Sequence, residues 1–356
     1  MRSRRFFFAW ALAAGCTLLV AGGCGDGSKR IVLISNAEAP FWDAVRAGLK
    51  KAAEDLELDE AGLTATMEVT DGTTEGQIRL LKNLATQSNV AAVAVSCAEP
   101  GNPSLIEALK ELRQQGVAVI TVDSDVDREK FSDARVAFVG TDNLAAGKEL
   151  GVAARNLQPD GGGFITFVGY TSSGNAIERV DGFTEGAGEK FKPLDNMGDR
   201  VDPIAMRKNV RTAIANHKDE LTALVGIWSQ NAPAAVDVLR KDGLREKYKV
   251  YSFDADPATI KAMGDGDVDA MVVQNPYRMG YDSIKLLKAI IDKDEKTQKE
   301  ILPELGQPGG DVHNTGLKIV VPDGSPLGKE AFSEQTEFLE LKEFREWLDE
   351  LELTGS

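Results

Sequence analysis

The chain has 356 residues, of which 42% are hydrophobic and 27% are charged, a composition typical of a globular protein long enough for two domains. Its formal charge is −15, which argues against nucleic acid or an anionic membrane surface as a partner. The three cysteines are Cys16, Cys24 and Cys97, and two of them lie near the N-terminus, which excludes a disulfide framework and a cysteine-based zinc site.

The first residues have the pattern of an export signal. Three arginines lie within the first five residues, an apolar run begins at Phe6, and small residues precede Cys24. The pattern resembles a bacterial lipoprotein signal, which implies a signal peptide over residues 1–23, lipidation of Cys24 and a lipid-anchored tether over residues 24–29. Cys16 also follows small residues and is a competing site, and an uncleaved membrane anchor is the alternative.

From residue 31 the chain alternates between short apolar runs and amphipathic segments. The run at residues 31–34 is continuous and mostly β-branched, as in a parallel strand that is covered on both faces. In the first half we expect strands at residues 31–34, 65–70, 90–95, 117–122 and 136–139, and helices at about 41–56, 75–86, 104–115 and 143–156.

The second half repeats this alternation. Repeated strand–helix units predict the α/β class, with two Rossmann-like lobes and parallel sheets. Because no long linker separates the halves, we expect a three-segment hinge, with short crossovers near Thr141, near Asn275 and before residue 317. We expect strands at residues 164–168, 223–227, 249–253, 270–273 and 317–321, and helices at about 175–190, 203–217, 232–241, 257–263 and 277–291.

The acidic segment 329–356 carries apolar residues at near-helical spacing, among them Phe338, Phe344 and Trp347. This spacing predicts an amphipathic helix whose apolar stripe docks on the body of the protein. Binding to a partner protein is the alternative.

The side chains needed for catalysis or metal binding form no recognisable motif. The two histidines, His217 and His313, belong neither to a triad nor to a metal motif, and we expect both at the surface. Cys97 follows an expected strand, and no base is indicated near it, so we interpret it as a small buried residue. The sequence therefore predicts a protein that is not an enzyme and that uses no metal or cofactor.

Two further patterns resemble ligand loops only in part. The glycines at residues 161–163 precede a strand instead of following one, so we expect a turn and not a phosphate loop. Aspartates alternate over residues 123–127 and 265–269 as in a calcium loop, but both segments lack the glycine at position six and the glutamate at position twelve. We interpret both as turns, with calcium binding as the alternative.

Polar and aromatic residues recur where the expected strands end. Parallel strands bring their carboxyl ends to one edge of a sheet, where open α/β sheets bind ligands, and two such edges that face each other form a cleft. Pro40 is suited to begin a helix after the first strand. The aromatic pair Phe41 and Trp42, which follows it, either lines this cleft or packs in the core. The residues at these strand ends are Ser35, Phe41, Trp42, Asp123, Arg179, Gln230, Asn231, Asp254 and Gln274.

Longer motifs resemble a known family. They read IVLISNAEAPFWDAVRAGLKKAAEDL, VITVDSDV, VGTDNLAAGKELG, NAIERVDGF, WSQNAPAAVDVL, YSFDADP and VVQNPYRMGYDSIK, in this order. From about Lys29 to Val321 the chain resembles the type I periplasmic binding proteins of the ribose-binding class, the soluble sugar receptors of ABC transporters. We accordingly expect an N-terminal lobe of residues 30–141 and 275–310, a C-terminal lobe of residues 142–274 and 311–328, and the acidic C-terminal helix at 329–356.

The same resemblance implies the ligand and its site. A monosaccharide would lie between the lobes, with its hydroxyls bound by carboxylates, amides and a guanidinium, and with one ring face stacked on Phe41 or Trp42. Trp228 is a further candidate in the second lobe. The residues that match the ligand positions of the family are Ser35, Phe41, Trp42, Asp123, Arg179, Asn231, Asp254 and Gln274.

Three departures from the family leave the identity of the sugar open. Ala39 stands where a ribose receptor has asparagine before the proline, Ser124 stands where it has arginine after the aspartate, and Val201 stands near an expected aromatic residue. Another pentose, a hexose or a modified sugar therefore remains open beside ribose.

The resemblance also implies partners and a location. The partners are the permease subunits of an ABC transporter, and the protein is a monomer in the periplasm or at the outer face of a bacterial membrane, held by a lipid anchor alone. A receptor that presents its closed, sugar-bound form to a membrane signalling protein is the alternative.

Overall fold

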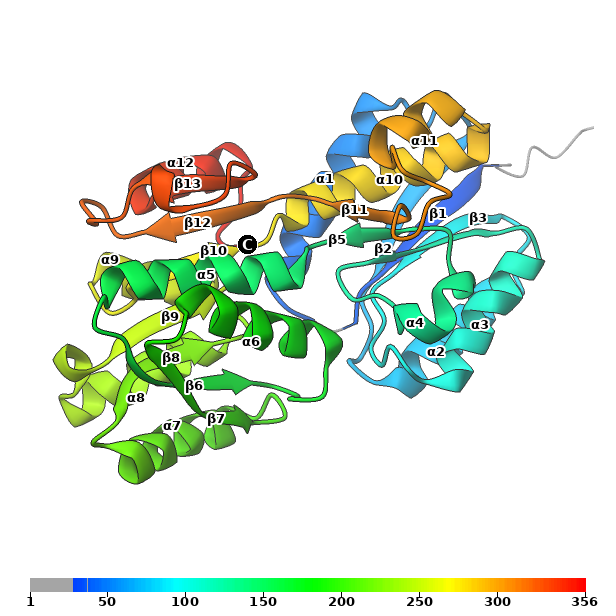
Figure 1. The fold of residues 1–356 in the computed structure, drawn as a ribbon. Helices are drawn as coiled ribbons and strands as arrows, with labels where there is room; N and C mark the ends of the chain where they lie inside the picture. Colours follow the sequence, from blue (N-terminus) through cyan, green and yellow to red (C-terminus); the bar gives the residue numbers. More distant parts are fainter. Residues whose placement is uncertain (1–27, 37) are drawn as a thin grey trace, which may run out of the picture.

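The computed structural model describes residues 28–36 and 38–356, which form two α/β lobes (Figure 1). The expected signal peptide, the lipidation site Cys24 and most of the tether lie outside the described residues. Across the described part of the chain, each helix is too short or too polar to span a bilayer.

The first lobe is built on a six-stranded sheet in the order β11-β5-β4-β3-β1-β2, and its paired strands are parallel. Helices cover both faces of this sheet. Its elements are β1 (Lys29–Ile34), α1 (Phe41–Asp55), β2 (Leu63–Glu68), α2 (Thr74–Ala85), β3 (Val90–Val95), α3 (Pro103–Gln114), β4 (Ala118–Val122), α4 (Arg128–Phe131), β5 (Phe138–Gly140), α10 (Pro276–Asp292), α11 (Glu295–Ile301) and β11 (Val312–Asn314).

The second lobe is built on a seven-stranded sheet in the order β13-β12-β10-β9-β8-β6-β7. Only the β10–β12 pair is antiparallel, so the prediction of two Rossmann-like lobes with mainly parallel sheets is confirmed. Its elements are α5 (Asn143–Leu157), β6 (Gly162–Val168), α6 (Gly174–Ala187), β7 (Phe191–Gly198), α7 (Pro203–His217), β8 (Leu221–Gly226), α8 (Asn231–Asp242), β9 (Lys249–Phe253), α9 (Pro257–Gly264), β10 (Ala270–Val273), β12 (Leu317–Val321), β13 (Thr336–Glu340) and α12 (Leu341–Glu350).

Burial on both faces explains the continuous apolar runs of the central strands. In β1, Ile31 and Leu33 pack against helices α1 and α10, whereas Val32 and Ile34 pack against α2 and α3. All four side chains are fully buried, and each stabilises the fold by about 1.5–3 kcal/mol relative to an exposed side chain. A strand of this kind leaves only its two ends free for polar residues.

Glycines allow helices α5 and α6 to touch backbone to backbone. A Cβ atom at Gly147 would lie 2.2 Å from the carbonyl oxygen of Arg179, and one at Gly182 would lie 2.1 Å from that of Leu144. The contact fixes the start of α6 against α5, and it therefore places the backbone from which the Arg179 side chain extends.

The chain passes between the lobes three times: from β5 to α5, from β10 to α10 and from β11 to β12. Thr315 in the third crossing donates its N–H and its hydroxyl to the carbonyl oxygen of Gly140 at the start of the first, at 2.9 and 3.1 Å. These two segments are therefore held side by side. The positions agree with the three crossovers expected from the sequence.

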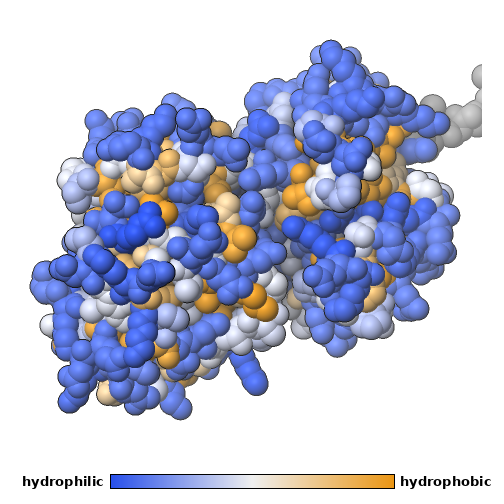
Figure 2. Space-filling model, viewed as in Figure 1, coloured by the Kyte–Doolittle hydropathy of each residue, from blue (hydrophilic) through white to orange (hydrophobic). Residues whose placement is uncertain are grey.

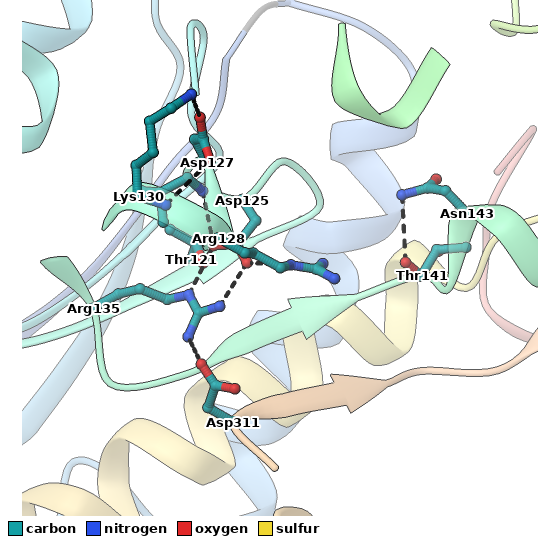
Figure 3. Close-up of polar contacts among 10 residues, drawn as sticks. Thr121, Asp125, Asp127, Arg128, Lys130, Arg135, Thr141, Asn143 and Asp311 are labelled. Carbon is teal, nitrogen blue, oxygen red and sulfur yellow. Dashed lines mark hydrogen bonds and ion pairs between the residues drawn. The ribbon is translucent and has the colours of Figure 1, made fainter. Parts of the chain in front are cut away.

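A buried ion-pair network fixes the third segment to the first lobe (Figure 3). Arg135 is 3% exposed and donates from Nε and Nη2 to the two carboxylate oxygens of Asp125, at 2.8 and 2.7 Å. Its Nη1 pairs with Asp311, which directly precedes β11. Burial raises the pKa of Asp125, but the hydrogen bonds and charge of Arg135 outweigh this effect and hold that pKa below its usual range.

Several expectations need correction. The N-terminal lobe extends to Asn314 and not to residue 310, because β11 pairs with β5. His313 is thus a half-buried strand residue, bound to Asp282 and to the carbonyl oxygen of Ile301.

The segment 329–356 is not one helix, because strand β13 joins the second sheet before α12 begins. The docking of α12 on the body is as expected, with its apolar residues Leu341, Phe344 and Leu348 in the core.

The two aspartate runs are bound to basic residues. In the first run, Asp125 binds Arg135, and Asp127 caps the start of α4. In the second run, Asp267 and Asp269 pair with Arg240 and Arg245. Within residues 28–36 and 38–356, no group of three or more acidic, histidine or cysteine side chains is arranged to hold a metal ion.

Candidate ligand-binding cleft

The carboxyl edges of the two sheets carry the candidate site, and the molecular surface is hollowed between the lobes (Figure 2). From the first lobe, Asp123 follows β4; from the second lobe, Asp254 follows β9 and Gln274 follows β10. The pKa of Asp123 responds to the charges of both Arg179 and Asp254, so these three groups lie within electrostatic range across the space between the lobes.

Three side chains form a polar cluster in the second lobe. Gln274 donates from Nε2 to Asp254 Oδ1 at 3.0 Å, and Arg179 Nη1 lies 3.9 Å from Asp254 Oδ2. All three residues are at least 94% buried. Within the described chain, Gln274 Oε1 is a buried atom without a hydrogen-bond partner, so the cluster retains an acceptor that is not used internally.

Arg179 is held in position on three sides. Its Nε donates to Asn143 Oδ1 at 2.9 Å, and its Nη1 donates to the carbonyl oxygen of Ile227 at 3.1 Å. The guanidinium carbon lies 4.7 Å from the centre of the Phe253 ring, in a cation–π contact. Two of the five N–H donors are therefore used internally, and the rest can meet acceptors on a ligand.

Burial governs the protonation of the two aspartates. It raises the pKa of Asp123 to about 6, although the charge of Arg179 and the hydrogen bond from Ser96 Oγ at 2.9 Å oppose the rise. The nearby charge of Asp254 adds to it. Burial also raises the pKa of Asp254, against the charge of Arg179 and hydrogen bonds from Gln274. The site thus favours a ligand that supplies hydrogen-bond donors to both carboxylates.

The aromatic pair divides between the core and the surface. Trp42 is 3% exposed and packs in the core with Leu33 and Val45, whereas Phe41 is half-buried beside it. The two rings meet edge to face, with their centroids 5.3 Å apart. Of the two, Phe41 is therefore the better platform for a ligand.

Two other predicted site residues bind mainly within the protein. Ser35 is fully buried, and its hydroxyl accepts the N–H of Thr70 at 3.2 Å, which ties the end of β1 to the chain after β2. Asn231 accepts the N–H of Trp228 at 3.0 Å and donates to Asp199 at 2.7 Å. The amide oxygen of Asn231 is thus used internally, whereas one amide hydrogen remains available.

Sequence reasoning missed residues that complete this edge. Ser96 and Asn143 position Asp123 and Arg179, and both follow strands whose ends were expected at this edge. Tyr170 follows β6, is half exposed and meets Trp228 edge to face at 6.1 Å. Trp228, the further candidate in the second lobe, has a buried Nε1 without a hydrogen-bond partner among the described residues.

Val201 is a solvent-exposed rim residue. It is 47% exposed and has a φ of 62°, and the preceding Arg200 has a φ of 55°. Asp199 Oδ1 accepts the N–H of Val201 at 2.8 Å and so closes this turn. Val201, which stands near an aromatic position of the family, therefore lies in a turn at the end of β7 and not in the polar cluster.

Two other surface hollows lie outside the polar cluster of Arg179, Asp254 and Gln274. One, of about 370 Å³, lies beside α2 and includes Asp71 and Arg79. The other, of about 390 Å³, lies at the opposite end of the second sheet and includes Arg245 and Asp269. In both, these charged residues pair with each other.

Residues 31–295 match a family model described as a periplasmic binding protein domain. The chain is 26% identical over 276 residues to the ribose import binding protein RbsB of Escherichia coli K12, covering 75% of this chain and 86% of that protein. It is 24% identical over 289 residues to the fructose import binding protein FruE of Bifidobacterium longum, covering 78% and 84%.

Solved structures with the same fold cover most of the chain. One is an ABC transporter solute binding protein from Burkholderia graminis in complex with D-arabinose, with 26% identity, a TM-score of 0.71 and coverage of 83% of this chain and 96% of that chain. Another, from Actinobacillus succinogenes with bound D-allose, has 17% identity and a TM-score of 0.71, and it covers 83% and 98%. At 17% identity, the likeness to the Actinobacillus succinogenes protein is one of fold alone.

Proposed function

We propose, because the chain belongs to the periplasmic binding protein family, that it is an extracytoplasmic receptor that binds a monosaccharide between its lobes and delivers it to an ABC transporter. The observation that carries the proposal is the buried cluster of Arg179, Asp254 and Gln274 opposite Asp123. The similar proteins named for sugar import support this function over the signalling alternative and over an enzyme.

The donor set suits a sugar because its groups complement hydroxyls. Asp123 and Asp254 accept hydrogen bonds from hydroxyl pairs, Arg179 donates its free N–H groups, and Gln274 offers an unused carbonyl oxygen. The half-buried ring of Phe41 supplies an apolar surface for the C–H face of the ring. Micromolar affinity corresponds to about 8 kcal/mol, which several charge-assisted hydrogen bonds and one stacked ring can supply.

Binding is coupled to motion of the lobes about the three crossovers. A sugar that bridges Asp123 in one lobe and Asp254 in the other interacts more strongly with a closed arrangement than with an open one, and so it shifts the equilibrium towards closure. The hydrogen bonds between Thr315 and Gly140 hold two of the three hinge segments together, which supports a coupled motion of these two segments.

The ligand residues, the protein partners and the oligomeric state of this receptor are proposed from the sequence and the family. The partners are the permease subunits of the transporter, and the receptor is a monomer. The proposed ligand residues are Ser35, Phe41, Trp42, Asp123, Arg179, Asn231, Asp254 and Gln274. Lipid attachment at Cys24 would hold the receptor at the outer face of the membrane. The export pattern before Cys24 supports this location.

A thermal-shift screen of the purified mature chain against pentoses, hexoses and nucleosides tests the function. A ligand at one hundred times its Kd adds about 2.7 kcal/mol to the free energy of unfolding, so a bound monosaccharide should raise the unfolding temperature by several degrees. The Gln274→Ala variant is the control and should show a smaller rise at equal concentration. If no monosaccharide changes the unfolding temperature of the unaltered chain, the proposed function is wrong.

A further inference from the structure

The segment after Val321 adds structure to the second lobe beyond the matched family region, which ends at residue 295. Strand β13 extends the sheet beside β12, and helix α12 packs Leu341, Phe344 and Leu348 into the core. Glu149 of α5 accepts hydrogen bonds from the Ser333 N–H and the Thr336 hydroxyl, at 3.1 and 3.2 Å. These contacts hold the segment along the lobe up to the end of α12.

The last residues then return to the candidate site. Ser356 donates its N–H to the carbonyl oxygen of Ala255 at 3.1 Å and accepts the N–H of Ala255 at 2.8 Å. Its hydroxyl donates to the carbonyl oxygen of Gln274 at 3.3 Å. The end marked C in Figure 1 accordingly lies beside β10, and Ser356 is 4% exposed.

Both residues that Ser356 contacts are part of the candidate site or adjacent to it. Ala255 directly follows Asp254, and Gln274 donates to the Asp254 carboxylate. Asp254 has a φ of 62°, a left-handed conformation that a non-glycine residue keeps only when its surroundings fix it. Its own N–H is bound to Val272, and Ser356 fixes the residue that follows it.

Gly355 allows this close approach. A Cβ atom at residue 355 would lie 2.7 Å from the carbonyl oxygen of Ala255 and 3.0 Å from Cδ of Pro257. The first neighbour is backbone, so a side chain at this position would push the last residues away from Ala255. The pairing of Ser356 with Ala255 therefore depends on glycine at residue 355.

We infer that Gly355 and Ser356 are positioning residues for sugar binding, which hold the backbone at Ala255 and Gln274 so that the Asp254 and Gln274 side chains keep the arrangement that a sugar requires. The inference rests on the proposed function, because it gives these residues a role in the same site. It extends the site to a segment outside the matched family region.

Sugar affinity of the full mature chain, measured by calorimetry with the sugar found in the thermal-shift screen, tests the inference. Gly355→Val should lower the affinity about tenfold, with little change in the unfolding temperature of the sugar-free protein, because the core contacts of α12 remain. Gly101→Val is the matched control, since a Cβ atom at Gly101 meets no atom within 4 Å. Ser356→Pro, which removes the N–H donor, should act like Gly355→Val, whereas Ser356→Ala, which keeps it, should lose less affinity.

A double-mutant cycle separates positioning from general destabilisation. If residue 355 acts through Gln274 and Asp254, Gly355→Val should lower affinity much less when Gln274→Ala is already present, because interacting sites are not additive. Additive losses, or equal sugar affinity of the Gly355→Val and Gly101→Val variants, would overturn the inference while leaving the proposed function intact. Failure of the unaltered chain to bind any sugar contradicts the proposed function first, and this inference with it.

Discussion

Asp123 and Asp254 occupy equivalent places in the two lobes, and both have left-handed backbones. Asp123 follows β4 with a φ of 61°, and Asp254 follows β9 with a φ of 62°. Each lobe thus turns its chain sharply after a buried strand and presents a carboxylate at the carboxyl edge of its sheet. The charge of Asp254 adds to the raised pKa of Asp123, so the two carboxylates lie within electrostatic range of each other.

Asp254→Asn should keep the fold and weaken sugar binding by about tenfold to a hundredfold, since a hydrogen bond to a charged group contributes about 1.5–3 kcal/mol. Asparagine tolerates the left-handed conformation, whereas alanine does not. Asp254→Ala should therefore also lower the free energy of unfolding, by about 1 kcal/mol relative to Asp254→Asn. Calorimetry with the bound sugar and urea denaturation measure the two effects. Equal stability of both variants would contradict a strained turn at this residue.

Arg179→Ala should abolish sugar binding and also lower the free energy of unfolding by about 3 kcal/mol, because it breaks a buried charge pair and leaves polar partners unpaired. The groups that would lose their partner are Asp254, Asn143 and the carbonyl oxygen of Ile227. Lys148→Ala is the control on the same helix pair, since the Lys148–Glu185 pair of α5 and α6 is exposed; it should change stability far less. Urea denaturation measures both, and an unchanged midpoint for Arg179→Ala would contradict its structural role.

The sequence predicts most of the fold because buried strands and amphipathic helices have distinct spacings. The predictions fail where burial does not determine the pattern. Strand β7 is a largely exposed edge strand that contains Pro193, so it has no continuous apolar run. In β13, Phe338 precedes the apolar residues of α12 at a spacing that continues the helical pattern, so the sequence predicts a helix where the structure has a strand.

The candidate site is predictable in its residue types but not in its contacts. Strand ends identify Asp123, Asp254 and Gln274 without any structure, because carboxyl edges bind ligands. Arg179 is oriented by Asn143, which lies 36 residues away in the sequence, so no local pattern predicts this contact. No local pattern encodes the return of Ser356 to the strand ends either, because that contact follows from the path of the whole second lobe.

Phe41 and Trp42 should respond differently to truncation. Phe41→Ala should reduce sugar affinity about tenfold through lost stacking, with a small loss of stability, because Phe41 lies at the border of the core. Trp42→Ala should lower the free energy of unfolding by about 3–5 kcal/mol, because its ring fills the core beside α1. Calorimetry and urea denaturation on both variants measure the difference. Loss of affinity in Trp42→Ala alone, at temperatures where it remains folded, would reverse this assignment.

The ionisation of Asp123 should make the sugar-free protein less stable as the pH rises. Its folded pKa of about 6 exceeds that of an unfolded chain, so its favourable contribution is complete below about pH 4 and is lost as the pH rises through about 6. Asp123→Asn removes this titration, and the variant should gain stability relative to the unaltered chain between pH 4 and 7. Asp133 is an exposed residue that pairs with Lys110, and this pairing lowers the pKa of the Asp133 carboxyl. Asp133→Asn is therefore the control and should show no such gain. Urea denaturation at pH 4, 5, 6 and 7 measures the difference, and a stability gap that stays constant over this range would show that Asp123 does not titrate there.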